Sequence, residues 1–184
     1  MSGKLKRLVD NYSRHIQVPW RDDAAALQRV IFCVYGEAEE LKLRARIDEF
    51  ELATREAGHE WHLFDLTDTF AEWLSKQRYA STYFKKPELI TNVLPKFRNE
   101  IEARFRAFLQ ESQADDNAVV AIQGVGSLFG LTKVKEIVDL LAPLVPGRLV
   151  VFFPGSYENN NYRLLDAYDG WGYLAVPITA NQNQ

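Results

Sequence analysis

The glycine-bearing segment 119–133 comes closest in this sequence to a chemical motif. It reads VVAIQGVGSLFGLTK, in which a run typical of a buried strand leads through Gly124, Gly126 and Gly130 to the start of a helix. Such loops often bind phosphates, because backbone N–H groups at a helix start attract anions. The segment therefore raises the question of whether this protein binds a nucleotide.

Neither of the two common nucleotide motifs fits the segment. The Rossmann pattern G-x-G-x-x-G needs a glycine where Phe129 stands. The P-loop pattern G-x-x-x-x-G-K-[ST], aligned on Gly130, needs a lysine where Leu131 stands, and that lysine offsets the charge of the phosphates. We therefore interpret the glycines as a tight turn that lets the strand and the helix pack closely.

The sequence is compatible with two functions of this loop. In the one that we favour, Ser127 and Phe129 face a partner protein or the core. In the alternative, backbone N–H groups alone hold an anion or a nucleotide. The residues of that alternative site are Gly124, Gly126, Ser127 and Gly130.

The asparagine-rich segment 153–166, FPGSYENNNYRLLD, is the second candidate. It follows a predicted strand, and α/β sheets bind ligands beyond the carboxyl ends of their strands. Asparagine suits turns, but tyrosine and arginine are residue types that anchor protein interfaces. We expect partner contacts from Tyr157, Asn159, Asn160, Asn161, Tyr162, Arg163 and Asp166. The acids Glu158, Asp166 and Asp169 lack the spacing of a metal site.

No residue pattern indicates catalysis or a metal centre. His59-x-x-His62 lacks the third and fourth ligands that zinc usually takes. Ser127 is not the serine of a G-x-S-x-G motif. The single Cys33 lies in an apolar run, where a thiol is buried and inert. We therefore expect no enzymatic activity, no metal and no cofactor.

Residues 78–86, RYASTYFKK, interleave aromatic and basic side chains. Such a patch can stack bases and pair with phosphates. It can equally connect two helices, with its aromatic rings in the core and its lysines in water, and we favour this interpretation. The formal net charge of −3 also counts against a nucleic-acid-binding surface, so we expect no direct contact with nucleic acid.

Predicted strands and helices alternate along the chain. Apolar runs predict strands at 29–35, 60–66, 118–124, 148–154 and 173–178. Apolar residues at helical spacing predict helices at 4–16, 37–58, 69–79, 87–112 and 133–144. Pro95 must break or kink the helix at 87–112, or start a second helix there. Thr69 and Glu72 match a capping box at the start of the third helix. This alternation is typical of a mainly parallel sheet.

The predicted fold is a single three-layer α/β domain, residues 1–178, with a mainly parallel five-stranded sheet and helices on both faces. Its topology would be P-loop-like or Rossmann-like, without a functional nucleotide motif. Residues 1–24 would be a helical extension and residues 179–184 a disordered tail. The hydrophobic content of 47% is typical of globular proteins. No apolar run approaches the roughly 20 residues that cross a bilayer, so we expect a soluble, cytoplasmic protein without membrane contact.

Several segments, taken in order, resemble a known family. They read RVIFCVY, EFELATREAGHEWHLFDLTDTFAEWL, VVAIQGVGSLFG, GRLVVFFPGSYENNNYRLLD and GWGYLAVPI, and the resemblance covers about residues 25–178. These segments are similar to the small B component of BREX (bacteriophage exclusion) systems. The pieces GVGSLFG and FFPGSYENNNYRLLD are the most specific.

The resemblance implies a role in phage defence. BREX systems combine a large ATPase, a methyltransferase and a protein with an alkaline-phosphatase-like domain, and the small B component is regarded as a non-enzymatic partner in that machinery. The family has no agreed catalytic motif, so no catalytic residue can be transferred. The resemblance therefore implies an adaptor that binds the large ATPase and the alkaline-phosphatase-like protein.

Overall fold

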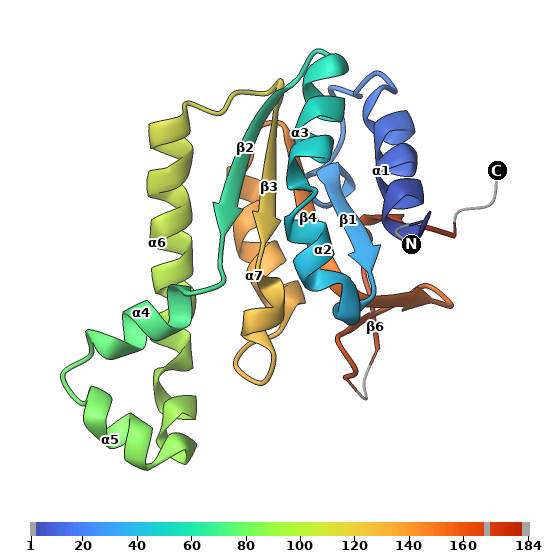
Figure 1. Cartoon of the computed structure of the whole chain (residues 1–184). Helices are drawn as coiled ribbons and strands as arrows, with labels where there is room; N and C mark the ends of the chain where they lie inside the picture. Colours follow the sequence, from blue (N-terminus) through green and yellow to red (C-terminus); the bar gives the residue numbers. More distant parts are fainter. Residues whose placement is uncertain (1–2, 168–169, 182–184) are drawn as a thin grey trace.

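The computed structural model describes residues 3–167 and 170–181, and these form three layers (Figure 1). A central sheet carries helices on both faces, which confirms the predicted α/β class. Within the described residues the sheet has seven strands, and its main path follows the order β2-β3-β4-β1-β7. The strands of this path are all parallel: β1 (Val30–Tyr35), β2 (Glu60–Asp65), β3 (Ala118–Gln123), β4 (Arg148–Glu158) and β7 (Val176–Ile178).

The expectation of a five-stranded sheet is wrong, because two further strands make the sheet mixed. β5 (Asn161–Leu164) pairs antiparallel with the outer half of β4, and β6 (Trp171–Gly172) pairs antiparallel with β5. The Rossmann-like alternative is also wrong. In a Rossmann sheet the first strand lies between the second and the fourth, whereas here β1 lies between β4 and β7.

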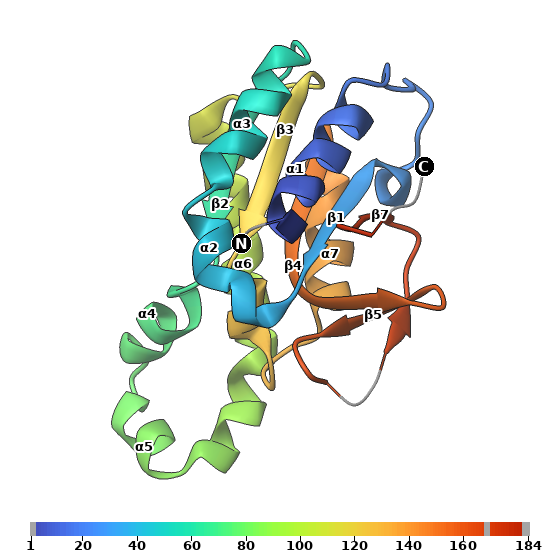
Figure 2. The same cartoon turned by 45° about the vertical axis from the view of Figure 1, so that its right-hand side comes forward.

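One face of the sheet is covered by α1 (Gly3–Ile16), α2 (Glu40–Arg44) and α3 (Ile47–Glu56). In both views α1 lies alongside α3 (Figures 1 and 2). The buried stripe of α1 has helical spacing and consists of Leu5, Leu8, Tyr12 and Ile16. Asn11 Nδ2 also donates a hydrogen bond to the Thr179 carbonyl oxygen (2.7 Å). Residues 182–184 of the predicted tail lie outside the described residues.

The other face is covered by α6 (Leu94–Ser112) and α7 (Val134–Leu141), and α4 (Thr69–Ser75) packs against α6. α6 buries Phe97, Ile101 and Phe105 completely. Pro95 lies in its first turn, where a missing N–H group costs nothing. Short 3-10 helices join the larger elements at Ala26–Arg29, Glu37–Glu39, Pro87–Val93, Val125–Leu128 and Ala142–Leu144.

The capping box predicted at the start of α4 does not form. Thr69 is the first residue of the helix and is buried, and no side chain caps this helix. Glu72 instead accepts a hydrogen bond from Arg104 Nη1 of α6 (2.9 Å). The acid therefore joins two helices rather than closing the end of one.

Residues 69–93 form an arm that extends from the sheet, with α5 (Ala80–Lys85) near its tip (Figures 1 and 2). The expectation that the aromatic residues of 78–86 lie in the core is wrong for two of them. Tyr79 is 57% exposed and Phe84 is 65% exposed, and only Tyr83 packs partly against the core.

The described part of the chain contains no helix that is both long enough and apolar enough to cross a bilayer.

A buried hydrogen bond links α1 to α3 and provides a first prediction. Tyr12 Oη lies 2.6 Å from Thr54 Oγ1, and Thr54 Oγ1 donates to the Phe50 carbonyl oxygen (2.8 Å), so Tyr12 is the donor in the first bond. We expect Tyr12→Phe to lower the free energy of unfolding by about 1 kcal/mol. Thr54→Val should cost about 1–3 kcal/mol, because it leaves the buried tyrosine hydroxyl without an acceptor.

Urea unfolding of the two single variants and the double variant would measure these costs. Because the residues share one interaction, the double variant should lose less stability than the sum of the single losses. Strict additivity would show that the bond does not connect the two helices energetically.

Candidate functional site

The carboxyl ends of β1 and β4 form the topological switch point of the sheet. These two strands are neighbours, but the chain leaves β1 toward β2 on one side and leaves β4 toward β7 on the other. Ligand sites of open α/β sheets lie in the crevice outside such a point. Two clefts open here, and both are lined by residues that follow these strands.

The inner cleft has a volume of about 230 Å³ and collects residues from four strand ends. Its lining consists of Glu37, Glu40, Arg44, Thr67, Gly124, Gly126, Ser127, Pro154 and Leu165. The segment around Gly124 lies beside the turn that follows β2. The sequence did not single out Arg44, Glu40 or Thr67, because they come from a short helix and a turn without a recognisable motif.

Arg44 is the cation in the lining of the inner cleft, and it already forms two side-chain hydrogen bonds and two ion pairs. Its Nε donates to Glu40 Oε1 (2.7 Å), its Nη2 donates to Thr67 Oγ1 (2.6 Å), and its Nη1 lies 3.7 Å from Asp65 Oδ2. Burial alone would lower the pKa of Arg44, but the hydrogen bond and charge of Glu40 and the charge of Asp65 raise it above its ordinary value. A bound anion would therefore have to compete with two carboxylates.

Asp65 organises the turn that follows β2. Its Oδ1 accepts hydrogen bonds from the Thr67 backbone N–H (2.8 Å) and from Thr67 Oγ1 (2.5 Å), while Oδ2 accepts one from Gln123 Nε2 (3.0 Å). The Tyr35 hydroxyl donates to Glu40, and burial followed by this contact raises the pKa of Tyr35. The ends of β1, β2 and β3 are thus joined by one polar network.

Gly124 has a packing role that explains the glycine at this position. Its φ of +84° is left-handed, and a Cβ atom built there would lie 2.5 Å from Thr67 Oγ1 and 2.6 Å from the Thr67 backbone nitrogen. Ser127 Oγ donates to the Gly124 carbonyl oxygen (2.7 Å), which closes the turn from within. The geometry agrees with the favoured interpretation of a tight, closely packed turn.

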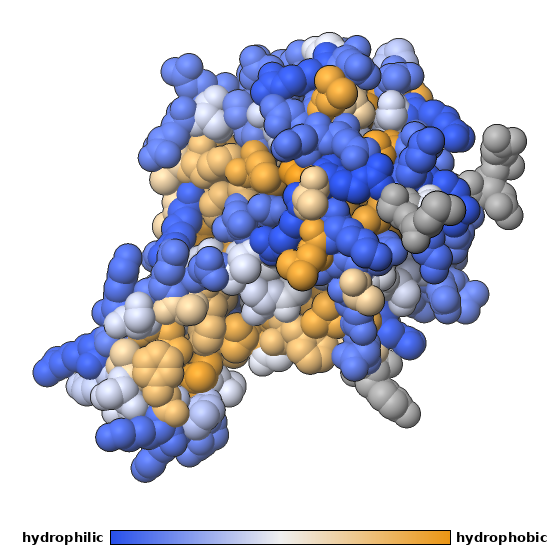
Figure 3. Space-filling model, in the orientation of Figure 1, coloured by the Kyte–Doolittle hydropathy of each residue, from blue (hydrophilic) through white to orange (hydrophobic). Residues whose placement is uncertain are grey.

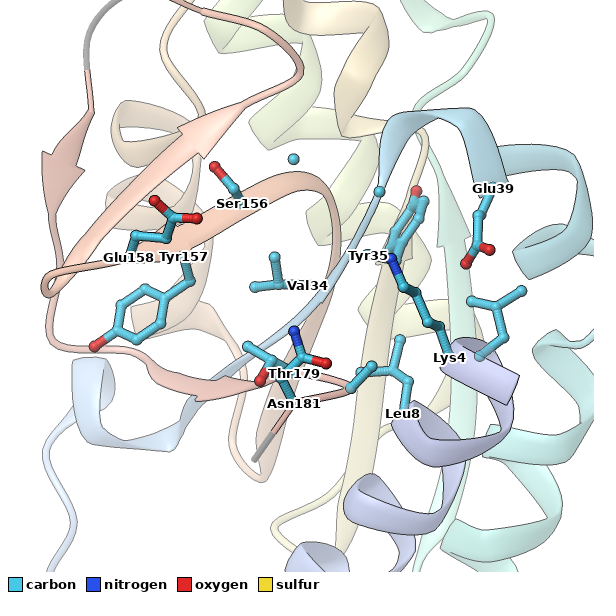
Figure 4. Close-up of a pocket in the computed structure, with 14 residues that line it drawn as sticks. Lys4, Leu8, Val34, Tyr35, Glu39, Ser156, Tyr157, Glu158, Thr179 and Asn181 are labelled. Atoms are coloured by element: carbon cyan, nitrogen blue, oxygen red, sulfur yellow. The ribbon is translucent and has the colours of Figure 1, made fainter. Parts of the chain in front are cut away.

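The outer cleft, of about 330 Å³, lies between α1 and the outer half of β4. Figure 4 shows Lys4 and Glu39 on one side and Ser156, Tyr157 and Glu158 on the other. The lining carries charges of both signs, so no single class of charged ligand is favoured there.

The asparagines of the predicted contact segment form a hairpin turn. Glu158 pairs with Asn161, and the two residues between them, Asn159 and Asn160, have φ values of +51° and +63°. A two-residue hairpin with two positive φ values is a type I′ turn, and asparagine favours that conformation. All three asparagines are exposed at the hairpin.

Tyr162 is not available to a partner, contrary to the expectation from its sequence context. It is completely buried, its ring lies 4.8 Å from that of Phe32, and its hydroxyl donates to the Ala175 carbonyl oxygen (2.8 Å). Arg163 and Asp166 are exposed, whereas Tyr157 is half-buried. Asp169 lies outside the described residues.

A third cavity, here called the Phe129 groove, has a volume of about 420 Å³. It is lined by Phe129, Gly130, Thr132, Lys133, Val134, Lys135, Leu164, Ala167, Gly170 and Trp171. Phe129 was a candidate from the sequence and is 47% exposed. Trp171, Lys133 and Lys135 were not candidates, because the groove forms between segments that lie far apart in the sequence.

The residues considered for metal binding or nucleophilic chemistry have other roles. His59 stacks on Trp20 with ring centroids 3.7 Å apart, and its Nδ1 lies 2.7 Å from Asn117 Oδ1. Burial raises the pKa of the Cys33 thiol, which is fully enclosed. Among residues 3–167 and 170–181, no group of three or more His, Cys, Asp or Glu residues could hold a metal ion.

Comparison with known protein families identifies a family for this chain. The model of the family described as BREX protein BrxB matches residues 63–176, which is more than half of the chain. The matched region includes the segment around Gly124 and the β4–β5 hairpin. No curated protein and no solved structure matches the chain.

The close approach at Gly124 gives a second prediction. Gly124→Ala should lower the free energy of unfolding by more than about 3 kcal/mol, because it adds a clash with Thr67 to left-handed backbone strain. Gly130→Ala is the matched control, since Gly130 has a φ of +76° but no atom within 4 Å of the added Cβ. Its cost should be about 1–2 kcal/mol, from strain alone.

Chemical denaturation of both variants would measure the difference. Equal losses would mean that the contact between the two turns does not stabilise the fold.

Proposed function

Because the chain belongs to the family of the BREX protein BrxB, we propose that it is a non-enzymatic adaptor of a phage-defence system. Family membership makes it a component of a BREX system. The adaptor role is our proposal, and so are its partners, the large ATPase and the alkaline-phosphatase-like protein. Its place of action is proposed to be the cytoplasm.

The Phe129 groove is the observation that carries this proposal. Phe129 is a large apolar residue that is 47% exposed, and it lies at the edge of a groove that also contains Leu164, Val134 and Trp171. An aromatic anchor beside an open apolar groove is typical of the energetic centre of a protein interface. The groove therefore suits an apolar side chain from a partner protein.

The charges at the groove indicate which kind of partner segment would bind there. Lys133 and Lys135 both line it, and none of the lining residues that the structure describes is acidic. Charge complementarity orients partners and speeds their association. We therefore expect a partner segment that combines an apolar anchor with acidic residues. The exposed hairpin residues Asn160 and Arg163 would extend the contact surface.

The candidate nucleophiles support a non-enzymatic role. The Ser127 hydroxyl donates to a carbonyl oxygen of its own turn rather than to a base, and a serine needs a base to act as a nucleophile. Cys33 is enclosed, and burial raises the pKa of its thiol. Neither group is positioned to attack a substrate.

Nucleotide or anion sensing is the second candidate function, and the position of the inner cleft at the switch point favours it. The N–H donors expected for this site were those of Gly124, Gly126, Ser127 and Gly130 of a P-loop-like domain. Gly124, Gly126 and Ser127 line the inner cleft, whereas Gly130 lines the Phe129 groove. The Ser127 backbone N–H already donates to the Gly124 carbonyl oxygen (3.1 Å). The charges count against it, because Arg44 is held by Glu40 and Asp65. Calorimetric titration of the protein with ATP would test this function. ATP binding that is unaffected by the Phe129→Ser substitution would support it.

A quantitative pull-down from the native host tests the adaptor role. The tagged wild-type protein should recover a large ATPase or an alkaline-phosphatase-like protein in near-stoichiometric amount. Phe129→Ser should reduce that recovery by at least about tenfold, because loss of a central anchor commonly costs 2 kcal/mol or more. Mass spectrometry would identify and quantify the recovered proteins.

Leu52→Ser is the matched control. Leu52 is 56% exposed and lies on α3, on the opposite face of the sheet from α7, so its replacement should leave the complex intact. Recovery of the wild-type protein alone would contradict the adaptor role. Equal recovery with Phe129→Ser and the wild type would contradict the placement of the contact in the groove.

A further inference from the structure

The tip of the arm carries unbalanced positive charge. Residues 76–87 contain Lys76, Arg78, Lys85 and Lys86 and no acid, although the whole chain has a formal net charge of −3. All four side chains are exposed, and none forms an ion pair within the described part of the chain. A local cluster of this kind attracts polyanions even when the net charge of the protein is negative.

Two aromatic rings are exposed among these cations. Tyr79 is 57% exposed and Phe84 is 65% exposed, and Arg78 Cζ lies 5.5 Å from the centre of the Tyr79 ring. α5 buries no residue, so the core does not require either ring. Figure 3 shows hydrophobic residues at the surface of the arm, at lower left, beside hydrophilic ones.

The base of the arm is firmly attached, which holds the tip away from the sheet. The rings of Phe70 and Trp73 lie 5.0 Å and 5.3 Å from the ring of Phe97 in α6. Arg104 of α6 also binds Glu72 of α4. The exposed rings are therefore presented by a fixed support.

We propose that the tip of the arm binds single-stranded nucleic acid. Bases stack on Tyr79 and Phe84, and the four cations pair with phosphates, which is the combination that nonspecific single-strand binding uses. This surface is separate from the Phe129 groove and adds a binding activity to the proposed adaptor function. It replaces the expectation of no nucleic-acid contact, which rested on net charge and on buried rings.

The composition of the tip favours nucleic acid over an acidic protein surface. Three of its four cations are lysines, and lysine is depleted in protein interfaces. Lysine does pair with phosphates as a point charge. Exposed rings between such cations match alternating bases and phosphates better than they match a continuous apolar interface.

Fluorescence anisotropy with a labelled oligothymidylate of about 16 nucleotides tests the proposal. If all four cations pair with phosphates, the logarithm of the association constant should fall with the logarithm of salt concentration with a slope of about −3. Tyr79→Ala and Phe84→Ala should each weaken binding about tenfold. Lys85→Gln combined with Lys86→Gln should reduce the steepness of the slope by about 1.4.

Leu41→Ala and Lys42→Gln are matched controls, because both residues are exposed on α2, outside the arm, and neither should alter binding. Absence of binding at about 50 mM salt would overturn the proposal. Binding that depends on the lysines but not on the rings would also overturn it, because it indicates a simple polyanion surface. Loss of a BREX protein from the pull-down with Tyr79→Ala, without oligonucleotide binding, would make the arm a protein interface instead.

Discussion

The close approach of Gly124 to the turn after β2 is the constraint on which the carboxyl end of the sheet depends. Only a residue without a Cβ atom leaves room for Thr67, and Asp65 holds that turn by accepting hydrogen bonds from Thr67 and Gln123. The left-handed backbone at Gly124 then directs the chain into the 3-10 helix Val125–Leu128. Phe129 follows directly, so the packing of two turns sets where the apolar groove begins.

The sequence predicted the α/β class, the strands of the parallel path and the turn at Gly124, because these depend on local patterns of apolar residues and glycines. It did not predict β5 and β6, because strands of four and two residues are too short to show a clear alternation of apolar and polar residues. It also misplaced Tyr162, which is buried only because the hairpin folds its ring onto Phe32. Such contacts join distant segments and leave no local signal.

The arm illustrates a different limit of sequence-based prediction. Interleaved aromatic and basic residues are compatible with a packed connector and with a binding surface, and composition alone does not separate the two. The exposures of Tyr79 and Phe84 argue against a connector whose rings all pack in the core. The candidate site shows the same limit. Arg44 and Trp171 become candidate site residues only because the fold places them in clefts with residues from distant segments.

β4 belongs to two parts of the structure at once. Its first residues pair with β1 and β3 in the buried centre of the sheet, and its last residues pair with β5 in the exposed hairpin. The hairpin is therefore a continuation of a buried central strand rather than a loose appendage. A partner that docks there meets a preorganised surface, so little conformational entropy is lost on association. Mechanical load on the hairpin would likewise pass straight into the core.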